Sequence, residues 1–275
     1  MLSDNRPIGV FDSGIGGITV LKALRKRLPH EDLVYLGDTA RLPYGTKSAA
    51  TVTAYATQAT RHLMNHDVKM VVIACNTASA VAIRPLTEAL KPLPVIGVIE
   101  PGAKAGVAAT KSGRIGVIGT EATVKGGAYV RAIHALMPAA KIAQAPCGLF
   151  VTLAEEGWVT GEVAEAAAKR YLAPLFKGRG APDTLVLGCT HFPVLARVIG
   201  RAAGKGVKLV DSAATTAKAV EAALAERGLA AKRRGKGKTR FMATDSPERF
   251  ARVGGIFFGE KIAMKDVELV DIRPS

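Results

Sequence analysis

The sequence predicts an α/β protein made of two similar, pseudo-symmetric lobes, each a mostly parallel sheet flanked by helices. Three observations support this fold class: short apolar segments alternate with amphipathic ones, most apolar segments are continuous, and the order of motifs repeats along the chain. Continuous runs of Val, Ile and Leu are typical of strands covered on both faces, as in parallel sheets. Alternating strands and helices indicate right-handed crossover connections.

Ten segments are predicted to be strands, with helices between most of them. In chain order, the strand segments are residues 8–11, 33–36, 70–74, 95–99, 115–118, 141–145, 184–187, 207–210, 240–243 and 267–270. The first helical segment, 18–28, places Val20, Leu21 and Leu24 on one stripe, which predicts an amphipathic helix. A dense basic run at 232–238 is predicted to be a solvated loop between a helix and a strand.

The sequence also contains an internal repeat. Two pairs of segments match: Ile8-Gly9-Val10-Phe11-Asp12-Ser13 with Ile115-Gly116-Val117-Ile118-Gly119-Thr120, and Val72-Ile73-Ala74-Cys75-Asn76-Thr77 with Val186-Leu187-Gly188-Cys189-Thr190-His191. The matching segments occur in the same order and at nearly the same spacing. We therefore expect one lobe from residues 1–98 together with 211–275 and a second lobe from 99–210, with the active site in the cleft between them.

Composition excludes several classes of protein. A chain of 275 residues with 48% hydrophobic and 22% charged residues is typical of a globular protein with one large domain or two smaller ones. The net charge of +15 is spread along the chain and aromatic residues make up only 5%, so nucleic acid is disfavoured as the primary partner. A basic field instead suits a small anionic substrate.

The three cysteines are too few and too scattered for a disulfide scaffold. The first residues carry no apolar signal segment, and no apolar run is long enough for a membrane helix. We therefore expect a cytoplasmic protein with no membrane partner.

Two of the cysteines occupy equivalent places in the two halves. Cys75 and Cys189 each follow a predicted strand, at the edge where open parallel sheets bind ligands. Each precedes a predicted helix, with Thr77 expected as the cap of the first and Pro193 in the first turn of the second. A helix N-terminus acidifies a nearby thiol, so we expect both thiols to be reactive. A single buried cysteine is more often a packing residue, but a matched pair favours function.

Two thiols that face one ligand from opposite sides suit inversion of a carbon centre. One thiolate removes a proton from one face while the other thiol delivers a proton to the opposite face. Asp12, at the end of the first strand, and His191, two residues after Cys189, are candidate partners for this acid–base chemistry. The alternatives for these two residues are a helix cap for Asp12 and a purely structural hydrogen bond for His191.

Signals for cofactors and metals are weak. The glycine run 12–17 has Thr19 where a dinucleotide fingerprint needs its third glycine, so it is better suited to a tight turn near a small anion. His62 and His66 are predicted to lie on a surface helix rather than to bind a metal. Cys147 is expected to pack. We expect no cofactor and no metal.

Several motifs together identify a resemblance that covers essentially the whole chain. They are Gly9-Val10-Phe11-Asp12-Ser13-Gly14-Ile15-Gly16-Gly17, Leu36-Gly37-Asp38-Thr39, Pro43-Tyr44-Gly45, Ala74-Cys75-Asn76-Thr77-Ala78-Ser79, Leu187-Gly188-Cys189-Thr190-His191-Phe192-Pro193 and Asp245-Ser246-Pro247-Glu248-Arg249-Phe250. The chain resembles the glutamate racemases of the cofactor-independent aspartate/glutamate racemase superfamily. This resemblance implies interconversion of L- and D-glutamate without pyridoxal phosphate, metal or ATP, in the supply of D-glutamate for peptidoglycan.

The resemblance also implies roles for individual residues. Cys75 is expected to deprotonate D-glutamate and Cys189 to deprotonate L-glutamate, with Asp12 and His191 assisting and Glu155 as an auxiliary near His191. Substrate contacts are expected from Asp12, Ser13, Tyr44, Gly45, Asn76, Thr77, Thr190 and His191.

The chain departs from the family pattern before Glu155, where Gly148 and Thr152 replace two usual prolines, so this segment is expected to be looser. Some members of the family carry an N-terminal extension that binds a cell-wall precursor as an activator, and we expect that regulation to be absent here. Two other functions remain open: a racemase of aspartate or a related amino acid, and a two-lobed amino-acid-binding protein without chemistry. A homodimer is also left open.

Overall fold

The computed structural model describes residues 4–272. The strands are β1 (Ile8–Asp12), β2 (Leu33–Gly37), β3 (Met70–Ile73), β4 (Val95–Gly97), β5 (Arg114–Gly119), β6 (Lys141–Pro146), β7 (Thr184–Gly188), β8 (Lys208–Asp211), β9 (Thr239–Ala243) and β10 (Val267–Leu269). All ten predicted strand segments are confirmed within these residues. The prediction of 95–99 is wrong at its end, because the backbone of Val98 is already helical and caps the next helix.

Helices connect most of these strands. They are α1 (Ile18–Arg27), α2 (Ala49–Met64), α3 (Asn76–Ala89), α4 (Ile99–Ala109), α5 (Glu121–Lys125), α6 (Ala128–Leu136), α7 (Leu149–Glu155), α8 (Glu162–Phe176), α9 (Ala196–Ala203), α10 (Ser212–Glu226) and α11 (Pro247–Phe258), with short 3₁₀ turns at Thr39–Arg41, Tyr44–Thr46, Phe192–Leu195 and Met264–Asp266. None of the helices within residues 4–272 has the length and apolar character that crossing a membrane requires.

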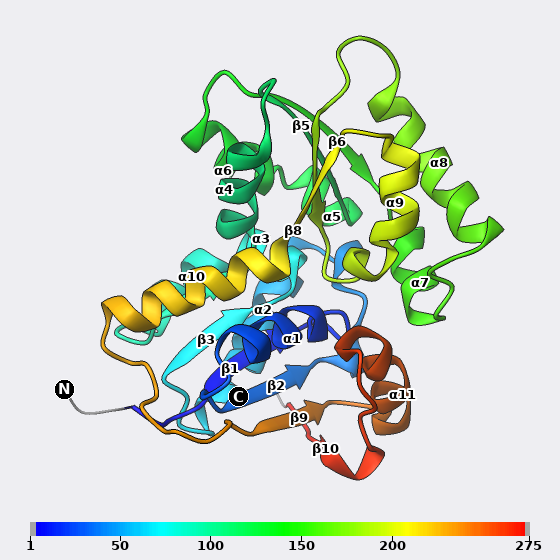
Figure 1. Cartoon of the computed structure of the whole chain (residues 1–275). Coiled ribbons are helices and arrows are strands. Elements are labelled where there is room, and N and C mark those ends of the chain that lie inside the picture. The colour runs from blue at the N-terminus through cyan, green and yellow to red at the C-terminus, as the bar shows by residue number, and fades with distance from the viewer. Residues whose placement is uncertain (1–3, 273–275) are drawn as a thin grey trace.

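The strands form two parallel sheets, which confirms the predicted fold class. The first has the order β10-β9-β2-β1-β3-β4 and the second the order β6-β5-β7-β8. The order β2-β1-β3-β4 in the first sheet is repeated as β6-β5-β7-β8 in the second, so the repeat seen in the sequence corresponds to a repeat in topology. Figure 1 shows the second sheet and its helices above the first.

Burial explains why the strand segments are continuous runs of apolar residues. Every residue of β1, β2, β3 and β7 is buried, because helices cover both faces of each sheet. The edge strand β6 is only partly buried. One core cluster continues from Ile15 and Phe250 beside the first sheet to Leu153 and Phe192 beside the second, so apolar packing joins the two sheets.

The chain returns to the first sheet through α10, which packs against α1 and runs along the junction in Figure 1. The predicted basic loop 232–238 does lie between α10 and β9. It is not wholly solvated, because Arg233 is partly buried in an ion pair of 2.8 Å with Asp32. This pair ties the loop to the segment that leads into β2.

Candidate active site

The candidate site lies where the two sheets present the carboxyl ends of equivalent strands. β1 pairs with both β2 and β3, and β5 pairs with both β6 and β7, so each sheet has a topological switch point at its central strand. Ligands of open parallel sheets bind in the crevice that a switch point leaves. Ser13 and Cys75 follow β1 and β3, and Thr120 and Cys189 follow β5 and β7. Both crevices therefore carry a hydroxyl residue after one strand and a cysteine after its neighbour.

A small pocket of about 40 Å³ joins the two crevices. Its lining residues are Ser13, Gly14, Leu42, Pro43, Tyr44, Gly45, Cys75, Asn76, Thr77, Thr120, Val151, Glu155, Cys189, Thr190 and His191. Both candidate thiols are in this set, and every predicted site residue except Asp12 is there with them.

Cys75 is itself the cap of α3. Its sulfur accepts a hydrogen bond of 3.4 Å from the N–H of Ala78, and its thiol donates to Ser13 Oγ at 3.5 Å. The prediction that Thr77 caps this helix is therefore wrong, because the helix begins one residue after the cysteine. The expectation of an acidified thiol is also wrong for Cys75. Burial, followed by the nearby charge of Asp12, raises its pKa to about 12 and outweighs the helix N-terminus.

Cys189 is the first of three side chains that contact one another in a row, followed by His191 and Glu155. Its Sγ lies 3.8 Å from Nδ1 of His191, and Nε2 of His191 lies 3.0 Å from Oε1 of Glu155. Burial alone lowers the pKa of His191, but its hydrogen bonds with Cys189 and Glu155 outweigh burial and raise it to about 10. At neutral pH His191 is therefore an imidazolium, which can donate a proton to the sulfur.

Asp12 lies behind the pocket rather than on its wall. It is fully buried, and its Oδ2 accepts a hydrogen bond of 2.9 Å from the N–H of Gly14. Its Oδ1 has no hydrogen-bond partner among residues 4–272. Burial raises the pKa of Asp12, which the charge of His191 partly opposes. Asp12 therefore does not line the pocket, but its charge raises the pKa of the Cys75 thiol.

The buried carboxylate of Asp38 anchors the loop that contains Tyr44 by hydrogen bonds. Tyr44 donates its hydroxyl proton to Asp38, which also accepts hydrogen bonds from Arg41 at 2.7 Å and from Thr244 at 3.0 Å. Burial and the charge of Asp38 raise the pKa of Tyr44 far above its ordinary value, so it stays a neutral phenol. The tyrosine therefore lines the pocket in a fixed orientation.

Polar contacts next to the thiols cross between the two sheets. Thr77 Oγ1 lies 3.0 Å from Thr120 Oγ1, and Thr19 donates a hydrogen bond of 3.0 Å to the carbonyl of Thr190. At Gly16 the approach is so close that an added Cβ would lie 2.4 Å from Nδ1 of His191. The glycine there allows one sheet's loop to reach the other sheet's histidine.

Sequence reasoning missed some residues of the site. Thr120 lines the pocket, and the internal repeat could have identified it, since it matches Ser13. Val151 also lines the pocket, from α7. Arg249 reaches Glu155 from α11 with an ion pair of 3.0 Å. It stands in a motif noted for its resemblance, but nothing in its local sequence indicates where its side chain ends.

The segment with the two missing prolines forms α7, so Thr152 lies inside a regular helix. Cys147 is fully buried in the core, as expected for a packing residue, and does not line the pocket. Among residues 4–272, no group of three or more His, Cys, Asp or Glu side chains could hold a metal ion.

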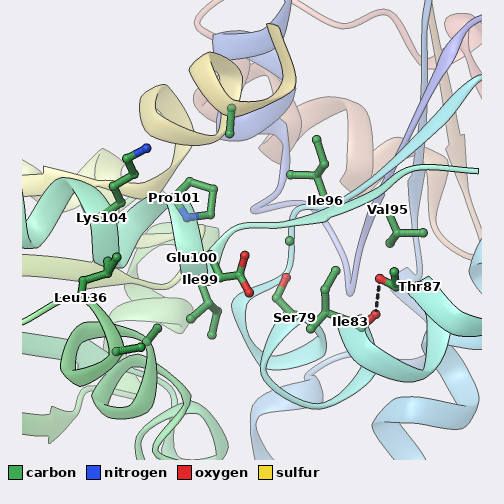
Figure 2. A pocket seen from close by; sticks show the side chains of 14 residues that line it. Ser79, Ile83, Thr87, Val95, Ile96, Ile99, Glu100, Pro101, Lys104 and Leu136 are labelled. Carbon is green, nitrogen blue, oxygen red and sulfur yellow. Dashed lines mark hydrogen bonds between the residues drawn. The ribbon is translucent and has the colours of Figure 1, made fainter. Parts of the chain in front are cut away.

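A second pocket, about 700 Å³ in volume, lies beside the junction between α3, β4, α4 and α6. Figure 2 shows its mostly apolar wall, with Glu100 in the middle of the view and Lys104 toward its edge. Within the described part of the chain, these two are the only charged side chains that line it, and neither thiol does. The smaller pocket therefore concentrates the acid–base groups.

The fold and the site define a class: a two-sheet α/β protein in which equivalent strands deliver paired cysteines to one pocket. The family model for Asp/Glu/Hydantoin racemase matches residues 18–220. A protein named glutamate racemase from Geobacter metallireducens is 50% identical over 257 residues, which cover 94% of each chain. The chain therefore belongs to the Asp/Glu/hydantoin racemase family, whose members include cofactor-independent amino-acid racemases.

Solved structures agree. The glutamate racemase of Francisella tularensis, in complex with D-glutamate, is similar with a TM-score of 0.90 and 40% identity over 98% of each chain. Glutamate racemase isoform RacE1 from Bacillus anthracis is similar with a TM-score of 0.92 and 37% identity over 98% of each chain.

Proposed function

We propose that this chain is an isomerase that interconverts L- and D-glutamate by proton transfer at Cα between two thiols. The observation that carries the proposal is that Cys75 and Cys189, from equivalent strands of the two sheets, line one pocket. Inversion of a carbon needs a base on one face and an acid on the other, and the pair supplies both. The similarity to proteins named glutamate racemase supports glutamate as the substrate.

We propose the two lobes as residues 1–98 with 211–275, and residues 99–210. Two features support these boundaries: α4 begins at Ile99, and α10 begins at Ser212 and packs against α1 of the first lobe. The outermost residues of this division, 1–3 and 273–275, lie outside the described residues.

The polar groups of the pocket suit an amino acid with two carboxylates. Oδ1 of Asn76 is buried and has no hydrogen-bond partner among residues 4–272, so it can accept from the substrate ammonium. The first N–H groups of α3 lack partners within the helix and favour an anion. Together with hydroxyls of Ser13 and Thr190, they are the groups that we assign to the carboxylates.

In the direction from D- to L-glutamate, the Cys75 thiolate removes the Cα proton. The Cα–H bond breaks, an S–H bond forms on Cys75, and the electron pair is left on the carbanion. The Cys189 thiol then gives its proton to the opposite face of Cα and becomes a thiolate. The reverse direction starts from Cys189 as the thiolate, so the two directions use opposite protonation states of the pair.

The groups that control the protonation of the two thiols differ between Cys75 and Cys189. With a pKa of about 12, Cys75 is a thiol in the free enzyme, and a substrate ammonium nearby favours its thiolate. Next to Cys189, the imidazolium of His191 supplies a proton and stabilises the thiolate once it forms.

Both thiols are nearly closed off from solvent in this structure, since Cys75 and Cys189 are each 5% exposed. We propose that the two lobes move apart to admit substrate and then close, which excludes water from the thiolates.

The experiment is racemisation of L-glutamate in heavy water with no added cofactor, analysed by mass spectrometry of both enantiomers at low conversion. Two thiols predict deuterium at Cα of the new D-glutamate, while the remaining L-glutamate stays largely protiated. Cys189→Ala should stop racemisation, and Cys147→Ala, which removes a buried thiol outside the pocket, should not. Protium retained in the product would contradict the two-thiol mechanism, and no racemisation by the wild type would overturn the function.

The same assay separates the remaining alternatives. Faster turnover of aspartate than of glutamate would make the chain a racemase of the shorter acid. Tight glutamate binding without exchange of the Cα proton would make it a binding protein.

We further propose that the product D-glutamate supplies peptidoglycan synthesis and that the enzyme works in the cytoplasm with a small-molecule substrate as its partner. No membrane partner is proposed, and nucleic acid is disfavoured because the charge of +15 is spread over the chain. Sedimentation of the pure protein tests the open question of a homodimer.

A further inference from the structure

Arg249 joins the two halves of the molecule beside the candidate site. It lies on α11, whose neighbouring strands belong to the first sheet, and its guanidinium is 3.0 Å from Oε2 of Glu155 on α7. The same guanidinium lies 3.6 Å from the carboxylate of Glu156. Helix α11 lies beside α7 in Figure 1, and an added Cβ at Gly157 would come within 3.4 Å of Ile256. The ion pair therefore crosses a packed junction.

The carboxylate of Glu155 is held from both sides. Oε1 faces Nε2 of His191 at 3.0 Å, whereas Oε2 accepts from Arg249, so each oxygen has its own partner. Only Nδ1 of His191 is then left to face Cys189, at 3.8 Å. Four side chains thus form one line from the surface to the sulfur.

This ion pair differs from the pairs on the open surface. In the pair of Arg201 with Glu165, both side chains are about half exposed, and such pairs contribute little. The side chain of Glu155 is only 10% exposed, whereas that of its partner Arg249 is 41% exposed. Burial raises the pKa of this carboxyl, and the hydrogen bonds from His191 and Arg249 bring it below its ordinary value. Arg249 thus helps to keep a nearly buried carboxylate charged.

We propose that Arg249 is a positioning residue for proton transfer at Cys189: it orients the Glu155 carboxylate, which in turn orients His191 against the sulfur. This inference rests on the proposed function. Arg249 comes from the first lobe, whereas Glu155, His191 and Cys189 belong to the second. The line of four side chains is therefore complete only when the lobes are together, which couples closure to preparation of one thiol.

The test compares Arg249→Gln with the wild type in both directions of racemisation. Loss of the ion pair should lower kcat/KM by about three- to tenfold. The fall must be equal in both directions, because the equilibrium constant between enantiomers is one. The directional measurement is therefore the primary isotope effect on kcat/KM with glutamate deuterated at Cα, in ordinary water.

A slower transfer at Cys189 has opposite consequences for the two substrates. Deuterated L-glutamate loses its label to Cys189, so its isotope effect should rise in Arg249→Gln. Deuterated D-glutamate loses its label to Cys75, so its isotope effect should fall as the later step becomes limiting. General damage to binding or closure moves both isotope effects in the same direction and would overturn the proposal.

Three further variants complete the design. Arg249→Lys keeps a cation that can reach Glu155 and should restore part of the rate and both isotope effects. Arg252→Gln removes an exposed arginine from the same helix, and Glu156→Gln removes only the more distant carboxylate. Both should behave as the wild type.

The outcomes distinguish a failure of the proposed function from a failure of the role of Arg249. A wild type that does not racemise glutamate overturns the proposed function itself. A wild type that racemises, with Arg249→Gln unchanged in rate and in both isotope effects, overturns only the role of Arg249. A thermal unfolding curve for each variant identifies any that has lost its fold, and in that case the Arg249→Lys isotope effects decide.

Discussion

Asn76 donates a hydrogen bond of 2.8 Å from its side-chain amide to the hydroxyl of Tyr129, and both side chains are buried. Asn76 is the first residue of α3, directly after Cys75, whereas Tyr129 lies on α6 beside the second sheet. The bond therefore fixes the helix that carries one thiol to the half of the molecule that carries the other. It also leaves Oδ1 of Asn76 free to face substrate.

Tyr129→Phe should weaken this connection. The amide of Asn76 then loses its buried acceptor, which costs about 1–3 kcal/mol of the free energy of unfolding. Urea denaturation measures the loss. The matched control is Tyr171→Phe, whose hydroxyl accepts a hydrogen bond of 3.2 Å from the exposed N–H of Leu149, and it should cost less than about 1 kcal/mol. Equal losses in the two variants would contradict a special role for the Tyr129 bond.

Asp12→Asn should make Cys75 more acidic. The carboxylate charge of Asp12 is, after burial, the main cause that raises the pKa of this thiol, so its removal moves the pKa downward from about 12. Alkylation of Cys75 by iodoacetamide, followed by mass spectrometry across pH, should then begin at lower pH than in the wild type. Asp266→Asn removes an exposed carboxylate and should leave the profile unchanged. An unshifted profile in Asp12→Asn would show that its charge does not reach the sulfur.

Asp12→Asn and His191→Asn should both slow turnover, by about 10²–10⁴-fold for loss of an acid–base partner. Each change acts mainly on its neighbouring thiol, so the loss in kcat should differ between the two directions, with KM changing in step. Initial rates at saturating L- and D-glutamate measure this. Losses below about threefold in both directions would make the two residues structural.

The stability of the protein should fall in alkaline solution through His191. Its folded-state pKa of about 10 lies above the ordinary value of 6.5, so its contribution is complete below pH 6.5 and is lost as pH rises through 10. The measurement is the free energy of unfolding of wild type and of His191→Asn on both sides of this window. The difference between them should shrink at the alkaline end, because only the wild type has an imidazolium at position 191 that loses its charge there. A constant difference would argue against the raised pKa.

Gly16→Ala should damage the site without replacing any of the acid–base residues. The new Cβ would lie 2.4 Å from Nδ1 of His191 and 2.6 Å from Oγ1 of Thr190, so the imidazole must move away from Cys189. Overpacking of this kind costs about 1–3 kcal/mol, and turnover should fall with it. Gly148→Ala is the control, since its Cβ meets nothing within 4 Å. Wild-type kinetics in Gly16→Ala would show that His191 needs no fixed position.

The sequence was sufficient for the fold class and for the position of the two cysteines after equivalent strands, because both depend on local patterns. Continuous apolar runs form strands that are covered on both faces, whatever else surrounds them. A cysteine that follows such a strand lies at the carboxyl edge of the sheet, which is why the strand pattern alone is enough to pair Cys75 with Cys189. The repeat of order in the sequence corresponds to the repeated strand order of the two sheets.

Capping and acidity were harder to predict, since each depends on an exact boundary or on distant segments. The helix α3 begins two residues earlier than a cap at Thr77 would place it, so Cys75 is the cap in place of Thr77. The helix N-terminus favours a thiolate at Cys75. Burial of the sulfur and the charge of Asp12 outweigh it, so the pKa is raised rather than lowered.

The sequence by itself determined which residue types reach the carboxyl edges of the strands, because strand direction and side-chain chemistry are properties of short segments. Only the tertiary structure decided which of them meet. Arg249 on α11 and Glu155 on α7 are far apart in the chain, and no local pattern records their distance of 3.0 Å. Asp12 directly precedes Ser13, which lines the pocket, but its own side chain lies behind the pocket wall. The hydrogen bond from the N–H of Gly14 holds its carboxylate there. Such contacts arise from the packing of two sheets against each other, to which residues from the whole chain contribute.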